Sequence, residues 1–389
     1  MKIGVFGGTF NPPHFGHIQS VKAAVAQLGL DKLIIVPSAT PPHKPVPDGT
    51  PSVEFRLNMA KLAFEDIPNS IVSDFEIKNG NMCYTIDTVT AIKRDFPESE
   101  LFLLLGTDMY LSLYSWKDWE NLLKLAAPAV FSRNNELKSE IENFSLTLRE
   151  KFDVRAKIVD NTVLDISSSA IRDMLPNRGG IKYLDENVYS YIISNRLYGA
   201  NPDWDWLRGK AHSMLDPKRV PHVIGCESEA VRLARHWGAC EDEAREAGIL
   251  HDITKKLDTE EQLQILRDHN IKIEPMAIGE EKLLHSKTGA VLAKSLFGVS
   301  DTVYNAIMWH TTGKAGMTDL DKIIYLADYI EPNRELDNIE ILRELSYKNL
   351  NMAMAMGIQM SVTDLLERGK TPNVITLDAL DSFKTDSRR

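Results

Sequence analysis

Apolar and polar positions follow a different rhythm in the two halves of the chain. The first half carries short apolar runs rich in β-branched residues or leucine, which is typical of buried strands. Between these runs, apolar residues recur at helical spacing, as in Ile18, Val21, Val25 and Leu28. The runs that we expect to form strands are Ile3–Phe6, Lys32–Pro37, Ile71–Ile77 and Leu101–Leu105.

The alternation of strands and helices indicates an α/β fold. A helix between two strands allows the strands to run parallel, so the pattern predicts a doubly wound parallel sheet of the Rossmann-like type. Ligands of such sheets bind beyond the carboxyl ends of the strands, where the strand order reverses. The segments that follow Phe6, Val36 and Leu105 are therefore expected at the site.

From about Trp206 onward, amphipathic helical patterns replace the strand patterns. They cover Ser228–Trp237, Glu241–His251, Glu260–Asp268, Lys287–Leu296 and Leu320–Ile330, and they predict an all-α domain. Glycine and proline within 198–202 end one helix and delay the next. We therefore place the two domains at 1–199 and 207–389, with a linker over 200–206.

The length and charge of the chain narrow the classes of function. A chain of 389 residues agrees with two domains. Its formal net charge of -10 argues against binding to nucleic acid, because that affinity depends on cationic contacts to phosphates. A local cluster of arginines still suffices for a small phosphorylated substrate.

Cysteine usage and hydropathy indicate a cytoplasmic protein without a membrane partner. Cys83, Cys226 and Cys240 show no C-x-x-C spacing, so we expect neither a disulfide framework nor a cysteine zinc site. No apolar run reaches the ~18 residues of a membrane span. A predicted strand stands at the beginning of the chain in place of a signal peptide. The sequence leaves homo-oligomer formation open.

A glycine turn after the first predicted strand carries the first candidate chemistry. The turn consists of Gly7, Gly8, Thr9 and Phe10. Glycines allow the backbone to approach a phosphate, and the helix start that follows presents unpaired N–H groups to an anion. His14 and His17 project from one face of that helix start. As hydrogen-bond donors to phosphoryl oxygens, such groups contribute about 3 kcal/mol each in comparable sites. This arrangement favours a phosphate site over two satisfied core histidines.

These residues resemble the signature of the nucleotidyltransferase superfamily that has an H-x-G-H motif. The second part of that signature is similar to Ile166–Arg172, where Ser169 replaces a threonine and keeps the hydroxyl. Further landmarks narrow the resemblance to the bacterial nicotinate-nucleotide adenylyltransferases, and it extends from Met1 to about Gly199. These landmarks are Pro41–Lys44, Asp74 with Glu76, Tyr84–Thr88, Leu105–Asp108 and Trp116.

The resemblance implies a role for individual residues. ATP would lie over the glycine turn, with His14 and His17 at its phosphates. The residues implied to hold the departing pyrophosphate are Ser167, Ser168 and Arg172, and those implied to bind the pyridine substrate are Thr85, Asp108 and Trp116. Lys44 would add positive charge, although a solvated loop lysine is an equal alternative. For Trp116, the alternative is a core residue.

The reaction implied for this half needs no nucleophilic side chain. The phosphate of nicotinate mononucleotide attacks the α-phosphorus of ATP in line, and pyrophosphate leaves with Mg²⁺. The protein then contributes positioning and charge stabilisation.

A series of histidines and aspartates in the helical half is suited to metal binding. The series is His222, His251, Asp252, His285, His310 and Asp328. Imidazole and carboxylate groups without a thiolate suit iron, manganese or zinc. An aspartate beside a histidine can bridge two ions ~3.5–4 Å apart, which activate water for attack on a phosphate. Each residue alone has a simpler explanation as a buried polar or surface group.

In this order, the series is similar to that of the HD-domain phosphohydrolases. The flanking segments His251–Lys255 and Ala327–Arg334 resemble the subgroup that cleaves diadenosine tetraphosphate symmetrically to two ADP. The resemblance implies that one ion is held by His222, His251, Asp252 and Asp328, and a second by Asp252, His285 and His310. Iron is the first expectation, with manganese and zinc as alternatives. The candidates for contact with the polyphosphate are Arg219, Lys255 and Arg334, each with a solvated cation as the alternative. Arg334 is favoured, because Pro332 fixes the backbone just after the helix that carries Asp328.

Alternatives remain for both halves. A sister transferase acting on pantetheine phosphate or a cytidylyl acceptor disagrees with the landmarks at Tyr84, Thr85 and Trp116. The helical half could instead be a phosphatase of other nucleotides or a nucleotide-sensing module without turnover. The complete ligand series favours turnover but leaves the substrate open, because one fold hosts many functions.

Overall fold

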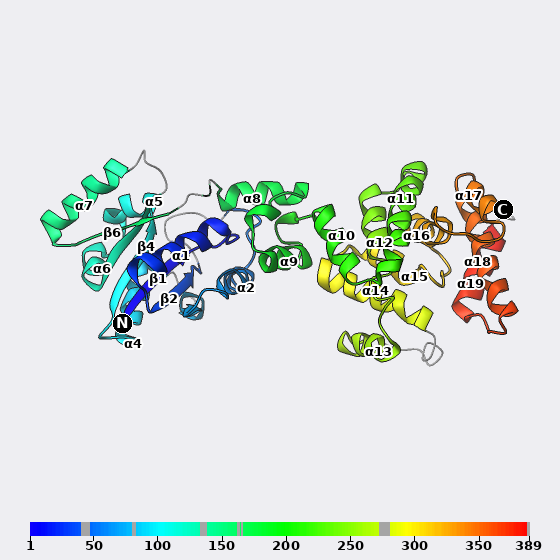
Figure 1. Cartoon of the computed structure of the whole chain (residues 1–389), viewed down its shortest axis with the longest axis horizontal. Helices are drawn as coiled ribbons and strands as arrows, with labels where there is room; N and C mark the ends of the chain where they lie inside the picture. Colours follow the sequence, from blue (N-terminus) through cyan, green and yellow to red (C-terminus); the bar gives the residue numbers. More distant parts are fainter. Residues whose placement is uncertain are drawn as a thin grey trace. The chain divides into compact units, whose positions relative to one another are not determined.

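The computed structural model describes residues 1–39, 47–79, 83–132, 138–161, 164, 166–271 and 281–386. The chain divides into two compact units, Met1–Asn201 and Pro202–Arg389 (Figure 1). The second unit begins with α10 (Trp204–Ser213), which starts inside the segment 200–206 that the sequence pattern assigns to a linker. Among the residues described, no helix combines the length and the apolar character needed to cross a membrane.

The first unit is built on a six-stranded sheet in the order β3-β2-β1-β4-β5-β6. Its strands are β1 (Lys2–Gly8), β2 (Lys32–Pro37), β3 (Ser70–Val72), β4 (Glu100–Gly106), β5 (Ala126–Ser132) and β6 (Lys157–Asp160). All neighbouring strands are parallel, which confirms the predicted doubly wound fold. The strand order reverses at β1, where Val5 pairs with Ile34 of β2 on one side and with Leu103 of β4 on the other. A ligand crevice is expected at this point.

Helices connect the strands of this sheet. They are α1 (Phe15–Leu28), α2 (Val53–Phe64), α3 (Phe75–Asn79), α4 (Thr85–Asp95), α5 (Thr107–Leu111), α6 (Trp119–Leu125), α7 (Lys138–Phe152), α8 (Ser168–Met174) and α9 (Glu186–Ser194), with 3₁₀ turns at Leu113–Ser115, Leu175–Asn177, Ile181–Tyr183 and Leu197–Gly199. Strands β1 and β4 are buried along nearly their whole length. That is the reason why they appear in the sequence as continuous apolar runs and not as alternating ones.

The third strand is shorter than predicted. The apolar run Ile71–Ile77 was expected to be one strand, but β3 ends at Val72 and α3 begins at Phe75. Ser73 interrupts the run, because its Oγ accepts a hydrogen bond from the backbone N–H of Phe75 (3.3 Å). A short hydroxyl side chain bonded to the backbone two residues on is a turn signal. The prediction for Ile71–Ile77 is therefore wrong beyond Val72.

The second unit is helical, in agreement with the predicted all-α domain. After α10 come α11 (Val220–Trp237), α12 (Glu241–Leu250), α13 (Thr259–Asp268), α14 (Glu281–Phe297), α15 (Asp301–Trp309), α16 (Asp319–Ile330), α17 (Ile339–Ser346), α18 (Leu350–Glu367) and α19 (Val374–Asp386), with a 3₁₀ turn at Pro217–Arg219. Helix α16 packs against α11, α12, α15 and α18 and forms the centre of the unit.

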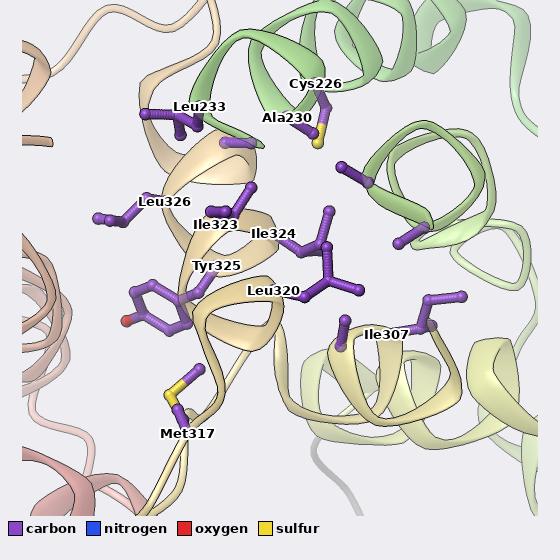
Figure 2. Packing of buried hydrophobic residues seen from close by; sticks show 14 of the residues in the cluster. Cys226, Ala230, Leu233, Ile307, Met317, Leu320, Ile323, Ile324, Tyr325 and Leu326 are labelled. Carbon is purple, nitrogen blue, oxygen red and sulfur yellow. The ribbon is translucent and has the colours of Figure 1, made fainter. Parts of the chain in front are cut away.

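Figure 2 shows how α16 divides its apolar side chains between its neighbours. Leu320 and Ile324 lie on the side that faces Ile307 of α15, and they belong to one buried cluster with it. Tyr325 points the other way, and its hydroxyl oxygen lies 3.3 Å from Ser361 Oγ of α18. Because α16 is buried on both sides, the position of its C-terminal end, which carries Asp328, is well fixed.

Candidate functional sites

A cavity of about 520 Å³ opens in the first unit at the carboxyl ends of β1 and β4. Its size lies within the range of small-molecule sites. The predicted site residues that line it are Gly7, Gly8, Thr9, Phe10, His17, Thr85, Asp108, Trp116, Ser168 and Arg172. Ser167 directly precedes Ser168 of this wall, and the ring of His14 lies beside that of His17. Lys44 lies outside the described residues. The cavity thus brings both halves of the motif together with the three residues expected at the pyridine ring.

Two histidines form the start of α1. His14 is the N-cap, and its Nδ1 accepts a hydrogen bond from the N–H of Gly16 (3.1 Å). His17 Nδ1 accepts a hydrogen bond from the N–H of His14 (3.2 Å), and the two rings lie 3.8 Å apart. A neutral imidazole carries one proton, so accepting at Nδ1 places that proton on Nε2. Both rings are therefore donors at Nε2.

Arg56 of α2 is a buried residue of this site that the sequence analysis missed. Its Nη1 donates to the carbonyl oxygens of Thr9 (2.9 Å) and Ser38 (2.7 Å), and its Nη2 to that of Ala39 (3.0 Å). Burial lowers the pKa of the Arg56 guanidinium. The guanidinium thereby ties the glycine turn to the segment that follows β2. A sequence signal existed, because Arg56 stands at helical spacing from the buried Met59, Ala60 and Ala63.

Helix α8, which carries the second part of the motif, contacts the loop after the glycine turn. Ser168 Oγ donates to the carbonyl of Pro12 (2.8 Å), and Arg172 Nη1 donates to that of Asn11 (2.7 Å). Ser167 caps the helix by accepting from the N–H of Ala170 (3.1 Å). A carbonyl directed into the site would repel a phosphate, and these hydrogen bonds give both carbonyls a donor.

The last turn of the first unit also reaches this loop. The Tyr198 hydroxyl donates to Asn11 Oδ1 (2.9 Å), and Asn11 Nδ2 donates to Thr50 Oγ1 (2.9 Å). Burial raises the pKa of Tyr198, so its hydroxyl remains a donor at neutral pH. Tyr198, like Arg56, was not assigned to the site by the sequence analysis.

The side of the cavity expected to hold the pyridine ring combines packing with polar groups. Trp116 is 9% exposed and belongs to the apolar core, yet it also lines the cavity. Both interpretations of this tryptophan are therefore compatible with its position. Glu76 is buried in the same wall, where its Oε1 accepts from Thr88 Oγ1 (3.0 Å). Burial raises the pKa of the Glu76 carboxyl.

In the second unit, the six predicted metal-binding residues converge from five elements. His222 comes from α11, His251 and Asp252 from the turn after α12, His285 from α14, His310 from the end of α15 and Asp328 from α16. Two groups of three offer ligand atoms that all lie within 4.8 Å of one another. They are His222 with His251 and Asp328, and His251 with Asp252 and His310.

Asp252 lies between the histidines. Its Oδ1 is 3.2 Å from His285 Nε2 and 3.8 Å from His310 Nε2. Its Oδ2 is 3.4 Å from His251 Nε2 and 3.8 Å from His222 Nε2. The two oxygens of one buried carboxylate thus face two different pairs of imidazoles.

The tautomers of three histidines follow from their outer hydrogen bonds. The Nδ1–H of His251 donates to the Gly248 carbonyl (2.9 Å), and that of His310 to the Ile307 carbonyl (2.7 Å). The Nδ1 of His222 lies 3.1 Å from a carboxylate oxygen of Glu331. Because carbonyl oxygens only accept, Nδ1 of His251 and of His310 carries a proton, and Nδ1 of His222 can donate to Glu331 in the same way. In the neutral form of each ring, which is the form that binds a metal, Nε2 is then the ligand atom that faces Asp252 and Asp328. Lone pairs directed at carboxylates fit a cation between them, so these residues suit a metal centre.

Three cations surround the two aspartates. Arg219 Nε donates to Asp252 Oδ2 (2.6 Å), and Arg334 Nη2 donates to Asp328 Oδ1 (2.9 Å). Lys255 Nζ lies 2.9 Å from His285 Nε2 and 3.7 Å from Asp252 Oδ1. The three residues expected to contact a polyphosphate therefore stand directly at the cluster.

The cluster keeps its carboxylates ionised despite their burial. Burial alone would raise the pKa of Asp252, but the neighbouring imidazoles, His251 above all, hold it well below its usual value. Asp328 behaves in the same way, with His222 and His251 lowering its pKa. Burial lowers the pKa of His285 to about 4, so this ring is neutral near pH 7, which is the form that binds a metal.

Two family models match the chain. One is described as cytidylyltransferase-like and matches residues 5–174, and the other is the HD domain, which matches residues 219–333. They cover the cavity of the first unit and the His/Asp cluster of the second.

Curated relatives match most of the chain or about half of it, and a solved structure matches about half of it. A Mycoplasma genitalium protein named probable nicotinate-nucleotide adenylyltransferase/Ap4A hydrolase is 32% identical over 90% of this chain and 95% of its own length. A probable nicotinate-nucleotide adenylyltransferase of Idiomarina loihiensis is 34% identical over 50% of this chain and 98% of its own length. The crystal structure of a predicted HD superfamily hydrolase involved in NAD metabolism from Clostridium acetobutylicum is 34% identical and covers 48% of this chain and 98% of its own, with a TM-score of 0.46.

Proposed function

Because the chain belongs to the family in which a nicotinate-nucleotide adenylyltransferase is joined to an Ap4A hydrolase, we propose that it has both activities. The first unit would transfer AMP from ATP to nicotinate mononucleotide, giving deamido-NAD and pyrophosphate. The observation that supports this most strongly is the single cavity lined by the glycine turn, His17, Arg172 and Trp116.

In the proposed reaction, a phosphate oxygen of the mononucleotide attacks the α-phosphorus of ATP. The new P–O bond forms as the bond to the β-phosphate oxygen breaks, and the electron pair leaves with pyrophosphate. His14 and His17 donate from Nε2 to the phosphoryl oxygens as negative charge accumulates, and Arg172 lies on the side of the leaving group. Mg²⁺ bound with ATP would neutralise part of the polyphosphate charge. Thr85, Asp108 and Trp116 orient the pyridine nucleotide.

An acceptor comparison tests the first activity. The full chain is incubated with ATP, Mg²⁺ and one acceptor at a time: nicotinate mononucleotide, nicotinamide mononucleotide or pantetheine phosphate. We expect the highest kcat/KM with nicotinate mononucleotide, measured by pyrophosphate release. A preference for pantetheine phosphate would reject the proposed substrate.

For the second unit, we propose symmetrical hydrolysis of diadenosine tetraphosphate to two ADP. The supporting observation is the convergence of four imidazoles and two carboxylates with three cations beside them. Two transition-metal ions, iron in the first place and otherwise manganese or zinc, would activate water and neutralise phosphate charge. Asp252 would bridge them, with His222, His251 and Asp328 on one side and His285 and His310 on the other. Arg219, Lys255 and Arg334 would bind the polyphosphate chain.

Product analysis with the full chain tests this second activity. Elemental analysis first identifies the metal in the purified protein, and diadenosine tetraphosphate is then added. ADP is the expected sole product, whereas AMP and ATP together would reject the symmetrical mode. Turnover of nucleoside monophosphates without turnover of the dinucleotide would reject the substrate, and no turnover at all would indicate a sensing module.

A further inference from the structure

Glu331 is a buried carboxylate next to the His/Asp cluster. It follows the last residue of α16 and is 1% exposed. Its Oε1 lies 3.1 Å from Nδ1 of His222. Its Oε2 accepts from the backbone N–H of Asn333 (2.7 Å) and from Asn333 Nδ2 (2.9 Å). Both oxygens are therefore in defined hydrogen bonds without any contact to the other histidines of the cluster.

His222 lies between two carboxylates that are three residues apart in the chain. Its Nε2 is 3.0 Å from Asp328 Oδ1, while its Nδ1 faces Glu331. Since a neutral imidazole has one proton, a hydrogen bond to Glu331 leaves the Nε2 lone pair directed at Asp328. An ion shared by His222 and Asp328 needs Nε2 without its proton, and Glu331 is the carboxylate that can then accept the hydrogen bond from Nδ1–H.

The surroundings of Glu331 are shaped to hold it in place. A Cβ atom at position 225 would overlap Glu331 Oε2, so Gly225 of α11 leaves the space that the carboxylate needs. Asn333 Nδ2 also donates to the carbonyl of Pro221 (3.2 Å), directly before His222. Arg343 of α17 donates to the Glu331 carbonyl (2.9 Å). A buried charge held from three elements has a fixed orientation.

The three histidines with assigned tautomers differ in their outer partner. His251 and His310 donate to the neutral backbone carbonyls of Gly248 and Ile307. His222 alone among these three donates to a carboxylate. A carboxylate partner makes the ring a stronger ligand than a carbonyl does, and loss of such a partner typically costs 10–100-fold in metal affinity.

We propose that Glu331 is a positioning residue for the metal centre, which fixes the tautomer of His222 and strengthens the ion bound through it. This inference rests on the proposed metal-dependent activity of the second unit. It further implies that the two ions are held unequally, because the carboxylate acts only on the side of His222.

Metal affinity tests the proposal without recourse to catalysis. The full chain is stripped of metal and loaded with Mn²⁺, and the ion that remains bound to the protein is measured by elemental analysis at each step of a titration with a chelator. Glu331→Gln keeps the shape of the side chain and removes its charge. We expect one ion of this variant to be lost at about 10–100-fold lower chelator concentration than in the wild type.

Glu229→Gln is the matched control. Glu229 lies on α11, as His222 does, and is similarly buried, but its Oε1 accepts from the hydroxyl of Tyr347 (2.7 Å). This variant should hold Mn²⁺ like the wild type. Equal weakening in both variants would indicate a general loss of packing and would overturn the positioning role.

The remaining outcomes separate this inference from the function on which it rests. A wild-type chain that takes up no Mn²⁺ would reject the metal centre itself. Normal uptake by the wild type and an unchanged affinity in Glu331→Gln would reject only the role of Glu331. If Glu331→Gln does not fold, as judged by circular dichroism, Asn333→Ala replaces it. Loss of the Nδ2 donor should then weaken binding of the same ion several-fold, and an unchanged affinity would again reject the role.

Discussion

The two sites of this chain are constructed in different ways. In the first unit, a glycine turn lines the cavity, and Arg56, Ser168 and Arg172 donate hydrogen bonds to backbone carbonyls of this turn and of the loop that follows it. In the second unit, side chains alone form the cluster, and Asp252 contacts several of them at once. A site built on backbone should weaken by degrees as single side chains are removed. A site built around one shared side chain should fail as a whole.

The largest effect is expected at Asp252. Asp252→Ala removes the carboxylate that lies between the histidines, so metal retention and hydrolysis should be lost together while adenylyl transfer continues at the wild-type rate. Elemental analysis and both activity assays on the full chain measure this. Asp268→Ala, at the exposed end of α13, is the control and should change none of the three values. Retained metal in Asp252→Ala would mean that the side chain is not shared.

His17 should have the next largest effect. In His17→Asn, the amide oxygen can replace Nδ1 as the acceptor from the N–H of His14, but no group remains at the position of Nε2. We expect turnover to fall about 10²–10³-fold, with binding of the pyridine substrate retained. His17→Gln, whose amide nitrogen reaches the position of Nε2, should recover part of the loss. Steady-state kinetics with nicotinate mononucleotide compare the two variants, and turnover near wild type in His17→Asn would reject the assigned role.

Arg56 should show a graded effect. Arg56→Lys leaves fewer donors for the carbonyls of Thr9, Ser38 and Ala39, and each buried carbonyl without a partner costs about 1–3 kcal/mol. The expected result is a lower free energy of unfolding and a KM for ATP raised about tenfold, with a smaller change in kcat. Urea unfolding and ATP kinetics provide the two values. Lys61→Met on the exposed side of the same helix should leave both unchanged, and an unaltered KM in Arg56→Lys would separate this residue from the site.

The smallest effect is expected at Tyr198. Tyr198→Phe removes one hydrogen bond to Asn11 Oδ1, which contributes about 1 kcal/mol. The KM for ATP should rise by about fivefold at most, and kcat should stay near wild type. Tyr191→Phe, which alters only a contact with Asn58, is the comparison. A loss of turnover as large as that in His17→Asn would contradict the graded behaviour of this site.

Patterns in the sequence sufficed for the fold class, because burial on both faces gives β1 and β4 continuous apolar runs. The sequence patterns did not predict strands whose residues are less typical of a strand. Strand β5 was not predicted, since its sequence begins Ala126-Ala127-Pro128 and Val130 is its one β-branched residue. The end of β3 was missed because Phe75 and Ile77 continue the apolar run past the hydrogen bond of Ser73.

The candidate sites show the same limit. Residues in a motif, such as His17, Asp252 and Asp328, could be selected from the sequence because the family resemblance covers them. Arg56 and Glu331 were not selected, although Glu331 lies in the resembling segment Ala327–Arg334, because their importance depends on burial and on partners distant in the chain. A charged residue is ordinarily expected at the surface, and only the three-dimensional arrangement distinguishes these two from solvated ones.

The histidine pair at the start of α1 has a consequence for how this site can change in evolution. One nitrogen of each ring closes the first turn of the helix, and the other is the one that we propose donates to the nucleotide. Serine or aspartate at position 14 could still begin the helix but would offer nothing to the substrate. A gene that loses the reaction can therefore keep a stable protein, whereas one that regains it must recover imidazole at both positions. The same two histidines thus begin the helix and serve the proposed reaction. A substitution can remove the second role while the first is kept.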